Sequence, residues 1–397
     1  MNYDSVISRT VAQIPPSGIR KFFDVVATMP GAISLGVGEP DFVTPNHIRE
    51  SAIRSIRSGE THYSSNWGLI ELRRAINRYQ EQRFGISYNP DNEIIVTVGA
   101  SEGIDLALRC VIEPGDEVLV PEPSYVSYQP VVTLSGGVAV PVPTCEEKCF
   151  KIDKETVSSL ITKKTKAIIL PYPNNPTGAI MTREELTEIA DAIRDHDIIA
   201  ISDEIYCELT YGGLTHTAFA SIPGMWERTV TLNGFSKAFA MTGWRMGYLC
   251  APKELAAMMC KIHQYTALCA PIMGQHAALA ALEDGFNDDF ADVTHMRKIY
   301  DQRRRIMVEG FRSMGFTVFE PLGAFYSFPN ISSLGYSSEE FATRLLKSQL
   351  VVTVPGTAFG KSGEGYVRCC YATSTDLIFE ALDRMQNFVN AEKTAGA

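Results

Sequence analysis

The feature that most constrains the fold of this chain is a regular alternation of two sequence patterns that begins near residue 93. Short runs of β-branched and other apolar residues alternate with stretches in which apolar residues recur at the period of an α-helix. This alternation is typical of a mostly parallel sheet between covering helices, because parallel strands need a crossover connection that is usually helical. We predict seven such strands, at Ile94–Val98, Glu117–Val120, Val138–Val142, Ala167–Leu170, Ile198–Ser202, Thr229–Leu232 and Met246–Cys250.

The length of the chain indicates more than one domain. At 397 residues it exceeds the size at which a single hydrophobic core usually stops growing. After Met273 a long helical region runs to about Met314, and short strands, a helix near residues 338–348 and a closing helix from Thr375 follow. The predicted fold class is therefore α/β, with a smaller α+β domain beside the large one. We expect an N-terminal segment at residues 1–45 that packs with the small domain, the large domain at 46–284 and the small domain at 285–397.

Charge and composition exclude several classes of protein. The net charge is −10, and the densest basic run, Arg303–Arg305, lies in a helical pattern, so we interpret it as a solvent-exposed face and expect no nucleic-acid partner. No run of about eighteen uncharged apolar residues is present, and residues 1–17 lack an apolar core, so we expect neither membrane insertion nor secretion. The nine cysteines form no C-x-x-C pair, which favours a reduced, cytoplasmic protein. The seven histidines lack metal-ligand spacing, so no metal is expected.

Polar residues follow several predicted strands, and open α/β sheets bind ligands at the carboxyl ends of their strands. The most informative segment, N-G-F-S-K-A-F-A-M-T-G-W-R-M-G, begins at Asn233 directly after a strand. An amine must be neutral to attack an aldehyde, and a buried lysine beside another cation, here Lys237 beside Arg245, has a lowered pKa. The alternative for Lys237 taken alone is an exposed surface lysine.

This segment resembles the active-site segment of the class I aminotransferases, which have PLP-dependent transferase fold type I and use pyridoxal 5′-phosphate (PLP). The segment A-M-T-G-W-R resembles that of the bacterial aspartate and aromatic branch, and the segment S-G-I-R-K-F near Arg20 resembles that of its aminotransferase A group. The resemblance implies that Lys237 carries PLP as a Schiff base and that Ser236 and Arg245 hold its phosphate. One departure is Gly234, which stands where some relatives carry a phosphate-binding serine.

The segment S-D-E-I-Y, at residues 202–206, matches a second motif of the family. The resemblance implies that Asp203 faces the pyridinium nitrogen of PLP and that Tyr206 binds its ring hydroxyl. A carboxylate in that place keeps the ring nitrogen protonated, so that the ring can accept electrons when the α-proton leaves. The alternative for Asp203 is a helix N-cap after the strand.

Two further segments match the family at the ends of strands. In N-N-P-T-G, Asn175 is implied to bind the ring hydroxyl and the substrate carboxylate, although the same residues also make a good turn. The segment G-A-S-E-G, from residue 99, joins a strand to a helix whose exposed amides and dipole attract an anion. The resemblance assigns Ala100, Ser101 and Glu102 to the cofactor at that junction.

The remaining assignments also come from the resemblance. Tyr125, in P-E-P-S-Y, is implied to stack on the cofactor, with a core tyrosine as the alternative. Arg368, in Y-V-R-C-C-Y, is implied to grip the substrate α-carboxylate as a bidentate fork, with an edge-strand arginine paired to an acidic residue as the alternative. The backbone amide of Gly38 would meet the substrate carboxylate, and Tyr63 would reach the phosphate in the other subunit of a homodimer.

We therefore interpret the chain as an aminotransferase with ping-pong kinetics, in which Lys237 carries a proton between Cα of the substrate and C4′ of the cofactor. By resemblance, the donor is an aromatic or aspartate-like L-amino acid and the acceptor is 2-oxoglutarate. A PLP-dependent C–S lyase or synthase and a non-catalytic PLP-binding sensor remain as alternatives. The sequence does not locate the residues that read the substrate side chain. Candidates for a distal carboxylate or an aromatic pocket are Arg20, Lys21, Arg109, Tyr63, Trp67, Tyr128 and Phe325.

Overall fold

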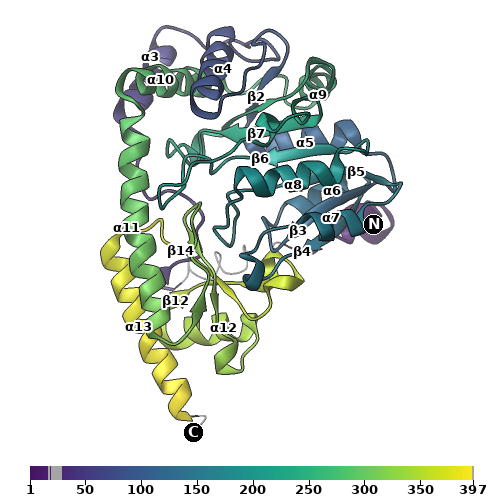
Figure 1. The fold of residues 1–397 in the computed structure, drawn as a ribbon. Helices are drawn as coiled ribbons and strands as arrows, with labels where there is room; N and C mark the ends of the chain where they lie inside the picture. Colours follow the sequence, from purple (N-terminus) through teal and green to yellow (C-terminus); the bar gives the residue numbers. More distant parts are fainter. Residues whose placement is uncertain (17, 19–28, 396–397) are drawn as a thin grey trace.

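A seven-stranded sheet dominates the computed structural model, which describes residues 1–16, 18 and 29–395 (Figure 1). The strand order is β2-β8-β7-β6-β5-β3-β4, and only β8 runs antiparallel to its neighbours in this sheet. All seven predicted strands and the mostly parallel arrangement are confirmed. The strands are β2 (Ile94–Val98), β3 (Glu117–Glu122), β4 (Val138–Pro143), β5 (Thr165–Leu170), β6 (Ile199–Asp203), β7 (Thr229–Gly234) and β8 (Met246–Cys250).

Helices cover both faces of this sheet because its central strands bury side chains on both faces. Within β5, Ala167 and Ile169 face one layer of core residues, whereas Ile168 and Leu170 face the other. The first layer includes α5 (Ala100–Val111), α6 (Tyr128–Leu134) and α9 (Lys253–Thr266). The opposite face is covered by α7 (Lys154–Leu160) and α8 (Arg183–Ile193) and, over β2 and β8, by α3 (Asn46–Arg57), α4 (Ile70–Phe84) and α10 (Ile272–Asp288).

The C-terminal part has its own core, built mainly from two long helices and short strands. Helix α11 runs away from the large sheet and lies beside α13 (Figure 1). Strand β14 lies between β10 and β13, antiparallel to both. The elements are α11 (Ala291–Ser313), β9 (Thr317–Val318), β10 (Tyr326–Ser327), β11 (Pro329–Asn330), α12 (Ser338–Gln349), β12 (Val351–Val352), β13 (Val354–Pro355), β14 (Val367–Cys370) and α13 (Thr375–Ala395). The predicted α+β composition of this part is confirmed.

The N-terminal segment contributes a strand to this smaller part. Before it lies the short helix α1 (Arg9–Ala12), and β1 (Ile33–Ser34) then pairs in parallel with β12. This pairing places residues 33–34 with the C-terminal part, as expected, whereas α1 contacts α6 of the large domain. The division at residues 45 and 284 stays a prediction.

The interpretation of Arg303–Arg305 as a solvent-exposed face is wrong. Arg303 and Arg304 are only 7% and 4% exposed. Arg303 forms an ion pair with Asp41, and Arg304 forms ion pairs with Asp301, one turn before it on α11, and with Glu320 beyond the end of the helix. The sequence pattern missed this because α11 packs against protein on more than one side, so two consecutive positions of the helix face inward. Only Arg305 extends its side chain into solvent.

No helix in the described part of the chain combines the length and apolar character needed to cross a bilayer.

The core of the small domain predicts a clear stability difference between two phenylalanines. The ring of Phe341 in α12 is fully buried and packs edge-to-face on Phe316 and Phe388, whereas Phe379 on α13 is 55% exposed. We expect Phe341→Ala to cost about 3–5 kcal/mol of unfolding free energy, because it leaves a cavity and removes buried apolar area. Phe379→Ala should change it by less than about 0.5 kcal/mol. Urea unfolding followed by circular dichroism measures both, and equal losses would contradict the described packing.

Candidate active site

The carboxyl ends of β3, β5, β6 and β7 open into a cavity of about 710 Å³. Residues from the small domain and from the N-terminal segment complete its wall. The structure brings together every predicted site residue except Glu102 and Tyr63. The predicted residues that line the cavity are Gly38, Ala100, Ser101, Tyr125, Asn175, Asp203, Tyr206, Ser236, Lys237, Arg245 and Arg368.

Lys237 follows the end of β7 and projects its amine into this cavity. The Nζ atom donates a hydrogen bond to the carbonyl oxygen of Gly38 at 2.8 Å. Burial lowers the pKa of Lys237 to about 8, and the nearby guanidinium groups of Arg368 and Arg245 lower it further against the opposing effect of Cys370. A substantial fraction of this amine is therefore neutral at mildly alkaline pH. The alternative of an exposed surface lysine does not describe this residue.

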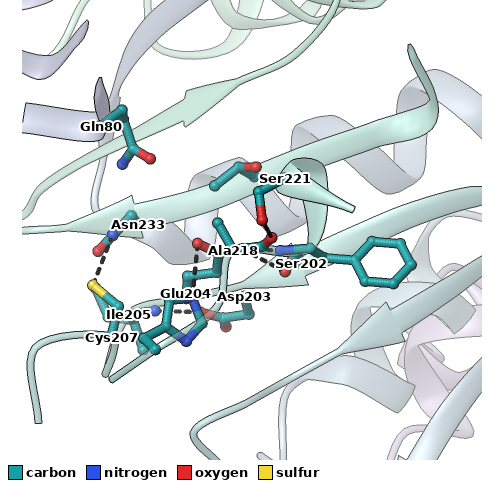
Figure 2. Close-up of polar contacts among 12 residues, drawn as sticks. Gln80, Ser202, Asp203, Glu204, Ile205, Cys207, Ala218, Ser221 and Asn233 are labelled. Carbon is teal, nitrogen blue, oxygen red and sulfur yellow. Dashed lines mark hydrogen bonds and ion pairs between the residues drawn. The ribbon is translucent and has the colours of Figure 1, made fainter. Parts of the chain in front are cut away.

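Asp203 is the last residue of β6 and is buried at the cavity wall. Its Oδ1 accepts a hydrogen bond from the backbone amide of Ile205 at 3.2 Å (Figure 2), and its Oδ2 accepts one from the hydroxyl of Tyr128 at 2.7 Å. Burial raises the pKa of Asp203, while both hydrogen bonds and the amine of Lys237 act in the opposite direction. The helix N-cap alternative does not hold, because residues 205–208 form a turn and not a helix, and the side chain faces the cavity.

The next residue along the chain, Glu204, turns its carboxylate away from the cavity. Its Oε1 accepts hydrogen bonds from Ser202 and from the backbone of Phe219, and its Oε2 lies 3.0 Å from Nε2 of His216. Figure 2 shows Asp203 and Glu204 with their separate partners. Asp203 therefore faces the cavity, whereas the carboxylate of Glu204 binds residues outside its lining.

Arg368 is buried at the opposite side of the cavity, where the small domain meets the sheet. Its Nη1 donates to Oδ1 of Asn175 at 2.9 Å, and its guanidinium lies 4.5 Å from the ring centre of Tyr326 and 4.8 Å from that of Phe359. Its Nε is buried without a partner among the described residues. Because β14 is the central strand of its sheet, the edge-strand alternative does not hold. This cation has a donor left for an anionic ligand.

Tyr326 was not predicted from the sequence, although it stands beside the candidate Phe325. The hydroxyls of Tyr326 and Tyr206 lie 2.8 Å apart and share a hydrogen bond. A Cβ atom on Gly38 would lie 2.5 Å from the hydroxyl oxygen of Tyr326, so a larger residue would displace this tyrosine. Tyr326 therefore links the small domain to the N-terminal segment at the cavity wall.

Glycines create the anion-binding end of the cavity, at the first turn of α5. Gly99 has a φ of +73°, and a Cβ atom there would lie 2.6 Å from Nη2 of Arg245. A Cβ atom on Gly247 would lie 2.4 Å from the backbone nitrogen of Ala100. The absence of side chains lets the guanidinium and strand β8 approach the helix start, where unpaired amides favour negative charge.

The departure at Gly234 has a steric explanation. A Cβ atom on this residue would lie 2.9 Å from the carbonyl oxygen of Met246 and 3.0 Å from Cα of Gly247. Both contacts are with backbone, which cannot move aside easily. A serine at residue 234 would therefore not fit between β7 and β8 as they are placed here.

Two predicted cofactor residues lie outside the cavity lining. Glu102 accepts a hydrogen bond from the backbone amide of Val98 at 2.6 Å, and its other oxygen lies 2.7 Å from Nδ1 of His263, so its side chain supports the helix start from behind. Tyr63 is 84% exposed. The sequence motif did not show that the side chain of Glu102 points to the side of the helix turn that faces away from the cavity.

The structure also shows which candidates for contact with the substrate side chain line the cavity and which do not. Tyr128 lines the cavity, whereas Trp67, Phe325 and Arg109 do not, and Arg109 pairs with Asp105 on α5. Arg20 and Lys21 lie outside the described residues. Among the described residues, no group of three or more His, Cys, Asp or Glu side chains is arranged to hold a metal ion.

Comparison with known proteins agrees with this geometry. The family model described as aminotransferase class I and II matches residues 30–385. The putative aminotransferase YugH of Bacillus subtilis (strain 168) is 52% identical, covering 97% of this chain and 99% of that protein. An aspartate aminotransferase of Pyrococcus abyssi is 45% identical, with 96% and 97% covered. The crystal structure of an aromatic aminotransferase from Pyrococcus horikoshii OT3 superposes with a TM-score of 0.89 at 44% identity, with 94% and 99% covered.

The burial of Lys237 predicts an unusual reactivity profile. In the protein without cofactor, we expect the rate of Lys237 acetylation to be half-maximal near pH 8, because only the neutral amine reacts. A free lysine derivative in the same mixture should reach half its maximum near its ordinary pKa of about 10.4. Competitive labelling with acetic anhydride and mass spectrometry of the Lys237 peptide measures both. A half-maximum at the free-lysine value would show that the amine is not enclosed as described.

Proposed function

Since this chain belongs to the class I and II aminotransferase family and is an aminotransferase, we propose that it transfers the amino group of an aromatic or aspartate-like L-amino acid to 2-oxoglutarate. The observation that carries this proposal is the cavity that encloses a low-pKa lysine together with a buried carboxylate and a buried arginine. The named relatives include an aspartate aminotransferase and an aromatic aminotransferase, which supports these two classes of donor.

The cavity fits PLP. Its anion-binding end combines the first amides of α5, at Ala100 and Ser101, with Ser236 and Arg245, and this donor set suits a phosphate group. The space that a Cβ atom on Gly99 would fill is taken by the Arg245 guanidinium, which brings the cation to the helix start. We propose that these groups hold the cofactor phosphate, with Glu102 supporting the helix from behind.

Other residues would bind the ring of the cofactor. Asp203 would face the ring nitrogen, Asn175 and Tyr206 the ring hydroxyl, and Tyr125 one face of the ring, with Lys237 as the covalent attachment point. PLP, when bound, supplies an aldehyde that captures the amino group and a ring that accepts electrons from Cα. The carboxylate of Asp203 would hold a proton on the ring nitrogen through its negative charge.

Two residues would handle the substrate. The guanidinium of Arg368, held by Asn175 and by the ring of Tyr326, would bind the α-carboxylate in two parallel hydrogen bonds, together with the backbone amide of Gly38. The Nζ atom of Lys237 would take the proton from Cα and return it at C4′, which a neutral amine with a pKa near ambient pH does efficiently. The same atom would therefore act as base and then as acid.

We also propose a cytoplasmic homodimer. The exposed ring of Tyr63 does not line the cavity of its own chain, which leaves it available to the phosphate end of a partner's cavity. The small-molecule partners are the amino acid and the 2-oxo acid, and neither nucleic acid nor membrane is part of the proposed function.

The half-reaction tests the proposed function directly. The protein reconstituted with PLP should convert bound PLP to pyridoxamine phosphate when given aspartate or phenylalanine alone, without any 2-oxo acid. Lys237→Ala should lose this conversion, because no other group in the described cavity combines an amine with this position. Chromatography of the released cofactor measures the conversion. Release of ammonia without an acceptor would instead favour the lyase alternative, and failure to bind PLP would favour neither enzyme.

Arg368 should contribute mainly to substrate binding. We expect Arg368→Lys to raise KM for every amino acid donor roughly 10- to 100-fold, because a lysine cannot make the paired hydrogen bonds to a carboxylate. Arg344→Lys, an exposed change on α12, is the matched control and should leave KM unchanged. Steady-state kinetics with the two donors checks this, and an unchanged KM in Arg368→Lys would exclude the arginine as the carboxylate site.

A further inference from the structure

Tyr128 contacts two residues of the cavity, Asp203 and Tyr125, to which the proposed function gives different roles. It is the first residue of α6 and is almost fully buried. Its hydroxyl donates to Oδ2 of Asp203 at 2.7 Å. Its ring packs edge-to-face on Tyr125, with the ring centres 5.5 Å apart and an angle of 83° between the planes. One side chain therefore contacts both the carboxylate and the aromatic ring that line this side of the cavity.

The carboxylate of Asp203 depends on its donors because it is buried. An ionised carboxylate loses its hydration on burial and is stable only where hydrogen bonds or opposite charge replace the water. In the described structure the donors are the Tyr128 hydroxyl and the Ile205 amide, and the nearby cation is Lys237. The adjacent carboxylate of Glu204 opposes ionisation, although its own hydrogen bonds lie elsewhere. Without the hydroxyl, one oxygen of Asp203 would lose its donor in this chain.

The direction of the hydrogen bond is also defined. Burial raises the pKa of Tyr128 well above its ordinary value, and the negative charge of Asp203 raises it further. The phenol therefore keeps its proton at every pH at which the enzyme would work and remains the donor. A donor hydrogen bond to an ionised acceptor is stronger than one between neutral groups.

We propose that Tyr128 is a positioning residue, whose hydroxyl holds Asp203 in the charge and orientation needed to keep the ring nitrogen of PLP protonated, and whose ring holds Tyr125 against the cofactor. The inference rests on the proposed function, because it requires the ring nitrogen to lie at Asp203. Tyr128 itself would not touch the reacting atoms.

The experiment uses the holoenzyme reconstituted with PLP that carries ¹⁵N at the ring nitrogen. The ¹⁵N chemical shift separates a protonated ring nitrogen from a neutral one. In the wild type we expect the protonated value, and in Tyr128→Phe, which keeps the ring and removes the hydroxyl, a shift toward the neutral value. The dissociation constant of PLP from the cofactor-free protein should rise about tenfold, the equivalent of one hydrogen bond to a charged group.

Two further variants complete the design. Tyr88→Phe removes another buried tyrosine hydroxyl, which lies 3.1 Å from Oγ1 of Thr231 and outside the cavity lining, and it should leave the ¹⁵N shift unchanged. Tyr128→Leu lacks both hydroxyl and ring, so it should give the same direction of shift and a still weaker PLP affinity. If Tyr128→Phe folds poorly, Tyr128→Leu carries the test.

The outcomes separate the two proposals. A wild-type shift retained in Tyr128→Phe or in Tyr128→Leu would overturn the role of Tyr128 and leave the proposed function intact. An equal change in Tyr88→Phe would also overturn it, because the effect would then be a general result of losing a buried hydroxyl. A wild-type protein that bound no PLP would overturn both.

Discussion

Two groups of opposite charge, the carboxylate of Asp203 and the amine of Lys237, are enclosed in one cavity, and much of the site follows from the cost of that enclosure. Burial disfavours the charged form of each group, so it raises the pKa of the acid and lowers that of the amine. The hydrogen bonds from Tyr128 and Ile205 act against this tendency for Asp203. Fewer groups oppose the effect of burial on Lys237. Its pKa of about 8 suits a group that must both give and take a proton.

Neither domain forms the cavity alone. The sheet supplies Asp203 and the segment that carries Lys237, while β14 supplies Arg368 and the N-terminal segment supplies the Gly38 carbonyl that accepts from Lys237. The loop that contains Gly38 is tied to α11 by the ion pair between Asp41 and Arg303. A long helix that leaves the large domain thus helps to fix the position of a residue beside the lysine.

The sequence motifs located most of the cavity because the geometry of a parallel sheet is regular. When the C-terminal ends of parallel strands meet at one edge, polar residues that follow Leu170, Ser202 and Leu232 within a few positions come close together. The motifs could not show the direction of a side chain within a turn. Glu102 stands next to Ser101 yet faces His263, and Tyr128, expected in a substrate pocket, donates to Asp203.

The sequence by itself determined the strand positions and the order of the site segments, because these depend on local pattern. The tertiary structure alone decided which polar side chains are buried and what they bind. Arg303 and Arg304 have a surface-like composition but are enclosed by ion pairs, and Tyr326, unremarked in the sequence, completes the cavity from a distant strand. Burial and pairing are properties of residues brought together from far apart in the chain, so a local pattern does not contain them.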